Sequence, residues 1–395
     1  MKLTNPTEHT MNDMKLYVAL DVHKDSIQCG IAHPGRSKPE VYAKWGGSNL
    51  CVERGLCKLL KKHDLTKDEV AICYEAGPTG FVLARRLHQL KYHCIVIAPS
   101  KIPQKSGDRV KTDRSDCRKL AGYLRSGELT SVHIPPCHDE AVRDLGRART
   151  DASEARTKCK QQLSMFLLRN GVRYSGKSRW TQGHMNYLRK YKFNDPSQQI
   201  VLEEYIIAIS AAEERVKRLE MHMENQLEDW DKKPYVKALM ALRGFKVVAA
   251  MTIVSEPGDL SRFPHPRQLM GFLGLVSSEE SSGAKRRQGS ITKCGNGHAR
   301  WMLVESASHY QYEAKVTETL SRRQAGQSRE VKIISWRAQN RLCYRFRQLA
   351  CRRLNRNKVV VAIARELSAF IWELHHQVAK EITLNNESCR SSAAQ

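Results

Sequence analysis

The spacing of apolar and polar positions changes twice along the 395-residue chain, near residues 138 and 233. In the first region, short apolar runs are bounded by Gly, Pro, Asn or Asp, which is typical of β-strands. The strands expected from these runs are 16–22, 26–32, 41–45, 70–76, 93–99 and 130–136. Apolar residues recur at helical spacing over 51–62, 78–90 and 111–126. Strands that alternate with helices predict an α/β sheet with helices packed on it.

The second region has helical spacing almost throughout. Residues 139–170 and 197–230 are rich in Glu, Arg, Lys, Leu and Ala and contain few Gly or Pro. In the second stretch, apolar residues recur at alternating separations close to three and four: Ile209, Ala212, Val216, Leu219, Met223 and Leu227. This heptad-like spacing predicts a helical hairpin or coiled coil. The alternative is an ordinary helical subdomain that uses the same apolar stripe as its core.

The third region, residues 236–382, is predicted to consist of helices joined by turns that carry Gly or Pro. Residues 238–263 resemble a helix–turn–helix pair with Gly244 at the turn, a layout that often holds a DNA backbone. Gly244 is equally explained as a plain helix cap. The residues after 384 are polar and are expected to be disordered. The predicted domains are therefore 14–138, 139–233 and 234–383, followed by a disordered tail over 384–395.

The charge balance favours a polyanionic partner. Lys and Arg number 66 against 41 Asp and Glu, which gives a net charge of +25 that folding does not require. Nucleic acid is the commonest partner of so basic a chain. Residues 321–358 are especially dense in Lys and Arg, interleave them with Trp336, Tyr344 and Phe346, and contain almost no acid. We interpret them as a nucleic-acid contact, the alternative being a solvated charged face.

Composition also narrows the location of the protein. No apolar run approaches the roughly 18 residues of a membrane-spanning helix, and the N-terminus lacks the layout of a signal peptide. The 12 cysteines are scattered, without a CxxC pair or zinc-ligand spacing. These features predict a soluble cytoplasmic protein with reduced thiols, no structural zinc and no membrane partner.

Four acidic residues of the first region are candidate metal ligands. Asp21 and Glu75 each end an apolar run, whereas Asp113 and Asp116 lie three apart on a predicted helix and so share one face. Four converging carboxylates would repel one another unless a cation lay between them. Mg²⁺ suits such hard oxygen ligands, with Mn²⁺ as a substitute. A single Asp after a strand would indicate no more than a turn or a helix cap.

A second candidate site lies at residues 277–300, which read SSEESSGAKRRQGSITKCGNGHAR. Serines and a glycine run directly into Lys285, Arg286 and Arg287. A small hydroxyl beside fixed positive charge suits a site that handles phosphate. On its own, the segment would be explained as a surface loop or a capping serine.

The sequence resembles the DEDD transposases of the insertion-sequence-110 family. The resemblance rests on the order Asp21, Glu75, Asp113 and Asp116 with YEAGPTG, APSKIP and DRVKTDRSD around the later members. It rests equally on LRGF, PRQLMGFLGL, the serine segment and LVESA farther along, and it covers about residues 15–380. It implies a RuvC-like domain of the RNase H fold, a coiled-coil connector and a mostly helical domain that supplies a nucleophilic serine.

The resemblance also implies roles and partners. The nucleophile would be Ser282, with Ser281 as its neighbouring competitor, and the four carboxylates would be catalytic through Mg²⁺. Residues expected to contact nucleic acid are Lys285, Arg286, Arg287, Lys293, Arg300, Arg109, Lys111 and Arg114. Expected partners are donor and target DNA, a structured non-coding bridge RNA and further copies of the chain, as a dimer or tetramer. The protein would be prokaryotic and would associate with the nucleoid when on DNA.

The sequence departs from the family pattern at three places, and two other functions are alternatives to this interpretation. Cys117 stands where the family usually has a small apolar residue, Cys294 interrupts ITKCGNG, and LRGF lacks a second glycine. One alternative is a metal-dependent, structure-specific endonuclease, resembling Holliday-junction resolvases, that cuts DNA with water. The other is a nucleic-acid-binding scaffold without catalysis.

Overall fold

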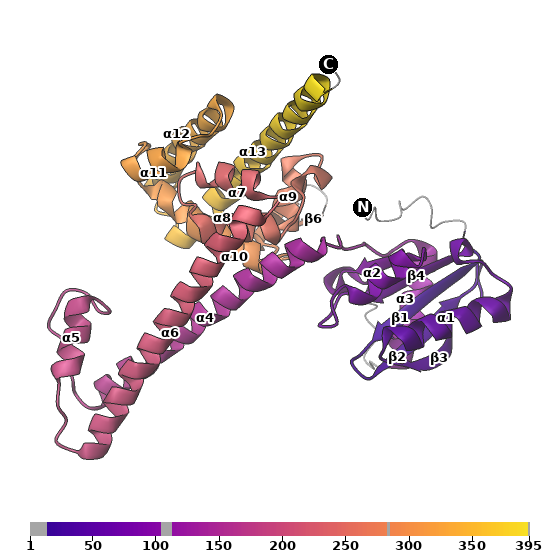
Figure 1. Ribbon diagram of the computed structural model, residues 1–395, viewed down its shortest axis with the longest axis horizontal. Helices are drawn as coiled ribbons and strands as arrows, with labels where there is room; N and C mark the ends of the chain where they lie inside the picture. The colour runs from indigo at the N-terminus through magenta and orange to yellow at the C-terminus, as the bar shows by residue number, and fades with distance from the viewer. Residues whose placement is uncertain (1–13, 104–112, 283–284, 394–395) are drawn as a thin grey trace. The chain divides into compact units, whose positions relative to one another are not determined.

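The computed structural model describes residues 14–103, 113–282 and 285–393, without the side chains of Asp113, Ser282, Lys285, Arg286 and residues 388–393. The chain divides into two compact units, Met1–Pro135 and Pro136–Gln395. Figure 1 shows the first unit as a sheet with helices and the second as a long helical hairpin joined to a group of helices.

The first unit is built on a five-stranded mixed sheet. Its strands are β1 (Leu16–Val22), β2 (Ser26–Ala32), β3 (Glu40–Gly46), β4 (Val70–Glu75) and β5 (His93–Ile97), in the order β3-β2-β1-β4-β5. Central β1 pairs antiparallel with β2 and parallel with β4. The prediction of an α/β sheet is confirmed for this unit.

The sixth predicted strand, 130–136, is wrong. This segment makes an isolated antiparallel bridge between Ile97 and Ser131. Pro135 and Pro136 have no backbone N–H to donate to a neighbouring strand, so the apolar run cannot extend a ladder.

Helices cover both faces of the sheet. They are α1 (Asn49–His63), α2 (Val82–Gln89) and α3 (Asp113–Ser126), with short 3-10 turns η2 (Lys67–Glu69) and η3 (Pro99–Lys101). Because side chains alternate along a strand, Leu16, Val18 and Leu20 pack with residues of α1 and α2. Tyr17 and Ala19 point to the opposite face and pack with residues of α3. The central strand is therefore buried on both faces.

The second unit begins with the helical hairpin that the heptad spacing predicts. Its helices are α4 (Cys137–Arg169) and α6 (Pro196–Asp229), with α5 (Gln182–Lys190) near the tip. The buried residues of α6 include Leu202, Ile209, Val216 and Met223, each seven residues from the next. Ala212 and Leu219 are half-buried. A seven-residue repeat keeps one seam of α6 against α4, as in a coiled coil.

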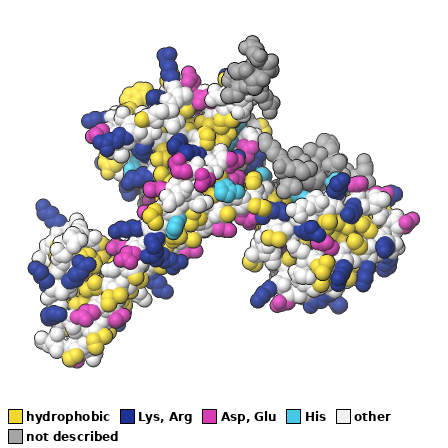
Figure 2. Space-filling view, in the orientation of Figure 1, with side chains coloured by type: hydrophobic (Ala, Val, Ile, Leu, Met, Phe, Trp, Pro, Cys, Tyr) yellow, Lys and Arg dark blue, Asp and Glu magenta, His cyan; other side chains and the backbone are white. Residues whose placement is uncertain are grey.

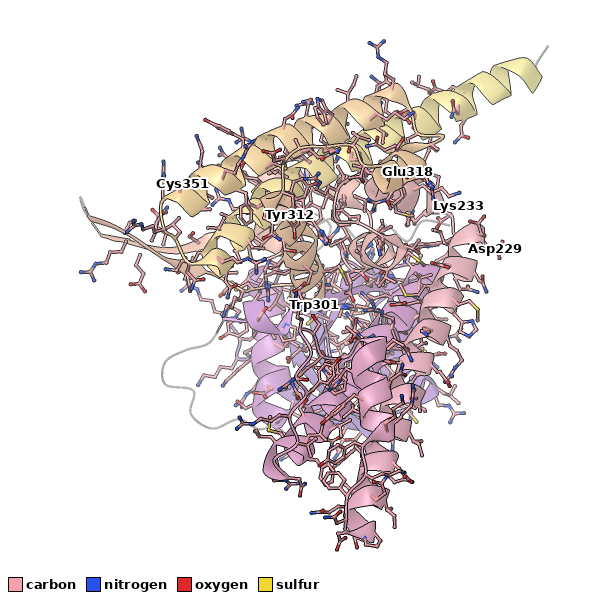
Figure 3. The ribbon with its side chains drawn as sticks, turned by 90° about the vertical axis from the view of Figure 1, so that its left-hand side faces the viewer. Asp229, Lys233, Trp301, Tyr312, Glu318 and Cys351 are labelled. Carbon is pink, nitrogen blue, oxygen red and sulfur yellow. The ribbon has the colours of Figure 1, made fainter. Side chains whose placement is uncertain are left out.

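A buried polar contact closes the base of this hairpin. The indole Nε1 of Trp230 donates to Oδ1 of Asp139 at 2.8 Å, and both side chains are buried. Trp230 follows α6 directly, and the chain then turns between Asp229 and Lys233, which lie close together in Figure 3. The contact fixes the end of α6 beside the start of α4.

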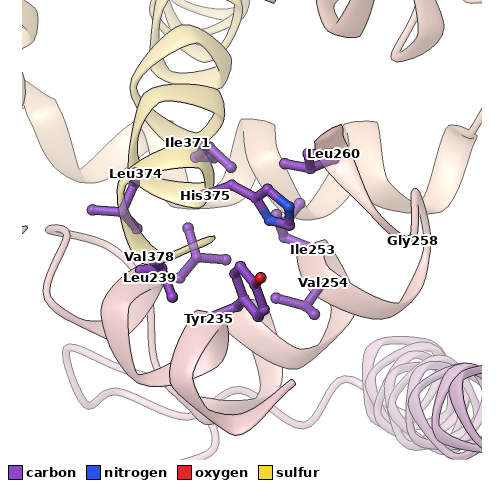
Figure 4. A pocket seen from close by; sticks show the side chains of 10 residues that line it. All are labelled: Tyr235, Leu239, Ile253, Val254, Gly258, Leu260, Ile371, Leu374, His375 and Val378. Carbon is purple, nitrogen blue, oxygen red and sulfur yellow. The ribbon is translucent and has the colours of Figure 1, made fainter. Parts of the chain in front are cut away.

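The remaining elements form the helical part of the second unit. They are α7 (Lys233–Met240), α8 (Val247–Ser255), η4 (Leu260–Arg262), α9 (Pro266–Phe272), α10 (Gly297–Ala307), η5 (Ser308–Gln311), α11 (Glu318–Gln324), α12 (Arg329–Cys351) and α13 (Arg356–Ala393). Their apolar side chains make one core cluster, which also takes in Val142 of α4 and Met223 of α6. The core leaves a small apolar cavity where His375 stacks on Tyr235 at 4.4 Å between ring centroids (Figure 4).

The structure corrects two predictions for this region. A β-hairpin, β6 (Ser277–Ser282) with β7 (Lys285–Ile291), interrupts what was predicted as helices and turns alone. Its described side chains are mainly polar and exposed, so it has no apolar alternation to reveal it. The tail predicted to be disordered from 384 continues α13 to Ala393. No Gly or Pro interrupts 356–393, and extending a formed helix costs far less than nucleating one.

Two further sequence expectations concern membranes and thiols. Over the described residues, the structure contains no helix with the length and apolar character needed to cross a bilayer. Each cysteine whose side chain is described is a free thiol, as the scattered spacing predicts.

Gly244 is placed by a close backbone approach as well as by its conformation. It joins α7 to α8 with φ of 88°, in the left-handed region, and a Cβ there would lie 2.4 Å from the carbonyl oxygen of Ser306. Gly326 has a similar φ of 74°, but a Cβ there would meet nothing within 4 Å. The two glycines therefore differ in packing and not in backbone conformation.

We predict that Gly244→Ala destabilises the second unit far more than Gly326→Ala. A left-handed alanine costs about 1–2 kcal/mol in each variant, and the clash with Ser306 adds about 1–3 kcal/mol in the first alone. Urea unfolding followed by tryptophan fluorescence measures both free energies of unfolding. Equal losses in the two variants would contradict the prediction.

Candidate active site

Asp21 and Glu75 lie side by side at the ends of two neighbouring strands. The parallel register of β1 and β4 pairs Leu20 with Tyr74, and the two acids are the next residues on each strand. Alternation places both on the face shared by Tyr17 and Ala19, which α3 covers. The Asp21 side chain is 23% exposed and Glu75 is exposed, so both carboxylates are open to solvent at this edge.

Helix α3 brings a third acid to the same face. A Cβ on Gly30 of β2 would lie 2.6 Å from the carbonyl oxygen of Cys117, so only glycine allows α3 to approach the sheet this closely. Asp116 precedes Cys117 on the first turns of the helix. Burial raises the pKa of the Cys117 thiol to about 11, and the negative charge of Asp21 adds to the shift. Cys117 is therefore a protonated thiol, close enough to Asp21 to sense its charge.

Asp21 and Glu75 therefore lie on the face of the sheet that α3 covers, and Asp116 lies on α3 itself; that the predicted carboxylates share one cation stays a prediction. Asp113 is the first residue of α3, and its side chain lies outside the described part of the structure. Among the described side chains, no three His, Cys, Asp or Glu residues are already arranged around a common ion position. Exposed carboxylate oxygens are nevertheless the ligands that Mg²⁺ prefers, and Mg²⁺ usually completes its shell with water and substrate phosphate. The donor set fits a hard divalent cation.

His23 was missed by the sequence analysis. Its Nε2 lies 3.2 Å from Oδ2 of Asp21, and its side chain is 52% exposed. It follows β1 two residues after Asp21, which puts both residues on the same side of the chain. That spacing was the available signal, but a lone histidine after a strand is common in turns.

A basic groove adjoins the acidic edge. It is lined by Gln28, Val41, Tyr42, Ala43, Lys44, Arg114, Ser115 and Arg118 of β2, β3 and α3. Arg114 was predicted to contact nucleic acid, whereas Lys44 and Arg118 were missed because they join it only through the fold. All three are exposed. The predicted residues Arg109 and Lys111 lie outside the described residues.

The serine segment forms the β6–β7 hairpin. Its register places Ser282 opposite Lys285, Ser281 opposite Arg286, and Glu280 opposite Arg287. The Ser281 hydroxyl is exposed and donates to Oε1 of Glu279 at 2.9 Å. Arg287 is exposed, whereas the side chains of Ser282, Lys285 and Arg286 lie outside the description. The sequence therefore puts a basic residue directly across from each of the two candidate serines.

Two glycines press the base of this hairpin onto the end of α9. A Cβ on Gly274 would lie 2.3 Å from the carbonyl oxygen of Cys294, and one on Gly295 would lie 2.0 Å from that of Phe272. Both have positive φ, of 63° and 74°. The motifs GFLGL and KCGNG are therefore packed backbone to backbone, which any side chain at these two glycines would prevent.

The remaining predicted contacts at this base, Lys293 and Arg300, differ in their surroundings. Lys293 is exposed and has φ of 55°. Arg300 is half-buried, and its Nη1 donates to the carbonyl oxygens of Leu273 at 3.0 Å and Cys294 at 3.1 Å. Arg300 thus holds the loop together, and its contact with nucleic acid stays a prediction.

Acidic residues of another helix pair with several arginines of helix α12, although the sequence around these arginines contains almost no acid. Arg337 pairs with Glu373 at 2.7 Å, and Arg341 and Arg345 pair with Glu366 at 2.9 and 3.4 Å, both acids coming from α13. An open groove farther along is lined by Tyr344, Arg347, Gln348, Cys351 and Arg352. Figure 2 shows Lys and Arg side chains spread over both units, in keeping with the net charge.

Comparison with known proteins gives two matching family profiles. A DEDD-type transposase profile matches residues 18–170, which contain all four predicted carboxylates. The profile described as the transposase IS116/IS110/IS902 family matches residues 236–322, which contain the serine hairpin and the loop after it.

Two relatives extend the similarity over most of the chain. A putative transposase, y4qE, of Sinorhizobium fredii is 40% identical over 358 residues, 91% of this chain and 88% of that protein. The transposase for insertion sequence element IS1533 of Leptospira borgpetersenii is 30% identical over 342 residues, 86% of this chain and 98% of that protein. This similarity covers nine-tenths of the sequence, and both family profiles match. The acids at the sheet edge and the serine hairpin lie within the two matched regions. The chain belongs to the IS110 family of DEDD transposases.

Proposed function

We propose that this transposase cuts and rejoins DNA strands through a covalent 5′-phosphoserine link on Ser282, with Mg²⁺ held by Asp21, Glu75, Asp113 and Asp116. The observation that carries the proposal is the placement of Asp21 and Glu75 at the ends of adjacent strands, on the face covered by the helix of Asp116. The mixed sheet with Asp21 on its central strand also supports an RNase H-like, RuvC-type assignment for the first unit.

The acids of the first unit would hold the cation. Asp21 and Glu75 would offer oxygens from the sheet edge, and the spacing of Asp113 and Asp116, three apart on α3, would let both offer oxygens from one face of the helix. When bound, Mg²⁺ stabilises negative charge on the attacking and leaving oxygens of a phosphoryl displacement. The exposed Lys44, Arg114 and Arg118 beside this edge supply a surface for the DNA backbone.

Ser282 would carry the covalent chemistry. Its Oγ attacks phosphorus, the bond from phosphorus to the 3′ oxygen breaks, and the serine proton passes to that leaving oxygen. The strand keeps a 3′ hydroxyl, and the 5′ phosphate stays on the serine. Attack by another 3′ hydroxyl reverses the step and restores both the phosphodiester and the serine hydroxyl. The bond energy is conserved, so rejoining needs no ATP. Residues 171–178, GVRYSGKS, match the GxxxxGK[ST] pattern, but they follow helix α4 and not a β-strand, so they lack the context of a phosphate loop.

The basic residues around the hairpin supply fixed charge for this step. Lys285 and Arg286 stand opposite Ser282 and Ser281 in the register, and Arg287 is exposed one position farther along. Positive groups held in place before the reaction stabilise the charge that develops on a phosphoryl group in its transition state. We therefore assign Lys285, Arg286, Arg287 and Lys293 to the DNA backbone.

Exchange of strands sets requirements on the assembly. Rejoining needs at least two DNA strands cut together, and hence at least two active copies of the chain. The proposal includes a structured bridge RNA as the guide to donor and target DNA, supported by family membership and by the net charge of +25. RNA recovered with the purified protein and mapped to DNA beside its gene tests that part.

We predict that Ser282→Ala abolishes the covalent protein–DNA adduct, because no other residue supplies the attacking oxygen. The measurement is adduct formation on labelled DNA in Mg²⁺, resolved on denaturing gels. Ser281→Ala is the matched control and should keep the adduct, because the proposed nucleophile, Ser282, is still present. If the Ser282→Ala variant still cuts DNA, and neither this variant nor the unaltered protein forms an adduct, the enzyme is an endonuclease that cuts with water.

We predict that Asp116→Asn and Glu75→Gln weaken divalent-cation binding by about tenfold or more, because each removes a charged ligand. Calorimetric titration of the full chain with Mn²⁺ measures the affinity. Asp68→Asn is the control, since Asp68 is 84% exposed in the same unit and outside this edge. Unchanged Mn²⁺ affinity in Asp116→Asn and Glu75→Gln would show that these carboxylates do not bind the cation. If the unaltered protein also fails to cut DNA, the result indicates a nucleic-acid-binding scaffold without catalysis.

A further inference from the structure

Glu256 is a buried carboxylate for which the proposed reaction has no use. It follows α8 directly, as the residue that caps the helix, and its side chain is 1% exposed. Burying an ionised carboxylate is costly unless charged or polar groups compensate for the lost water. The groups that contact Glu256 therefore indicate what its burial does for the structure.

Three side chains satisfy this carboxylate. Arg147 of α4 donates from Nε to Oε1 at 2.8 Å and from Nη2 to Oε2 at 3.0 Å, a bidentate pair. Asn296 donates from Nδ2 to Oε2 at 2.7 Å, and Nδ1 of His298 lies 2.8 Å from Oε1. One partner belongs to the helical hairpin, and two belong to the segment that follows β7.

The carboxylate is ionised in this setting. Burial by itself would raise the pKa of Glu256, but hydrogen bonds from His298, Arg147 and Asn296 outweigh it and lower that pKa to about 2. An ionised carboxylate has no proton to give, so Nδ1 of His298 is the donor in their contact. All four hydrogen bonds thus run toward Glu256.

A second link joins the same segment to α4. Nε2 of His298 lies 2.9 Å from Oγ1 of Thr150, one turn along α4 from Arg147. Asn296 also caps α10, because its Oδ1 accepts from the backbone N–H of Ala299 at 2.9 Å. Both ring nitrogens of His298 therefore make a polar contact, and Asn296 is fixed at the start of α10. Together these contacts hold residues 296–298 in place.

These contacts lie close in sequence to the serine hairpin. Strand β7 ends at Ile291, five residues before Asn296, and the intervening turn is packed on α9 through Gly274 and Gly295. The segment has little freedom between the end of β7 and the polar cluster of Arg147, Thr150, Glu256, Asn296 and His298. A change in that cluster would reach the base of the hairpin within a few residues.

We propose that Glu256 is a positioning residue, which fixes residues 296–298 against α4 and thereby sets the direction in which the β6–β7 hairpin projects. The link to catalysis rests on the proposed role of Ser282, whereas the locking of the segment does not. Glu256 is too buried to touch DNA, so it acts through other groups. Apolar replacements of buried ion pairs are often as stable or more stable, so defined geometry is the function we assign to the cluster.

The test compares Glu256→Gln with Glu330→Gln in the full chain. The glutamine keeps the shape of Glu256 but loses its charge, and its buried amide N–H₂ donor would face the other donors. Glu330 is exposed on the first turn of α12 and serves as the control. We expect amide hydrogen exchange over 292–300 to be about tenfold faster in Glu256→Gln and unchanged in the control. DNA affinity should be unchanged, and the rate of adduct formation should fall about tenfold.

Two more variants separate positioning from loss of the fold. Glu256→Asp keeps the charge one methylene short and should recover part of both the exchange protection and the rate. Thr150→Val removes only the second link to His298 and should change both readouts in the same direction by a smaller factor, even if Glu256→Gln fails to fold.

Several outcomes would overturn the proposal. Unchanged exchange over 292–300 in Thr150→Val and Glu256→Gln would show that the cluster does not hold the segment. Faster exchange throughout α8, α10 and α13, with adduct loss matched by loss of DNA binding, would show a merely structural role. If the unaltered protein forms no adduct, the proposed function fails, and hydrogen exchange alone then decides whether Glu256 locks the segment.

Discussion

The parallel pairing of β1 with β4 is the constraint on which the acidic site depends. Parallel strands end at the same edge of a sheet, so the register that pairs Leu20 with Tyr74 carries Asp21 and Glu75 out of the core together. Like charges placed side by side repel each other. Pairing thus creates the electrostatic demand that a cation would satisfy. The contact of α3 with Gly30 adds Asp116 to the same face.

The serine side of the molecule solves a different problem, which is to hold an exposed polar hairpin in one orientation. A two-stranded hairpin without an apolar face has little stability of its own. Here the base of the hairpin compensates, because Gly274 and Gly295 allow backbones to touch and Arg300 ties two carbonyl oxygens together. The buried charge of Glu256 then connects this base to α4. In the proposed mechanism, a rigid base is what would position the Ser282 hydroxyl at the end of β6.

The sequence could predict those features that depend on spacing along the chain. Five of the six strands, the heptad seam of α6 and the turn at Gly244 each follow from a local pattern and the burial it implies. Features that depend on contacts between distant segments could not be predicted. Lys44 lines the same groove as Arg114 only after β3 and α3 have packed, and the pairing of Arg341 with Glu366 requires α12 to lie on α13. The hairpin at 277–291 was missed because exposure on both faces removes the apolar alternation.

The division of groups between the two units has a chemical consequence. The first unit holds the carboxylates and the second holds Ser282, so each unit on its own lacks one half of the proposed reaction. A serine hydroxyl is a weak nucleophile at neutral pH until a base or metal activates it. A cation held by the acids alone favours hydrolysis, which would leave broken ends. Under the proposed mechanism, the need for both halves at one phosphate restricts cutting to assemblies that can also rejoin the strands, and the direction of the β6–β7 hairpin becomes a condition of rejoining.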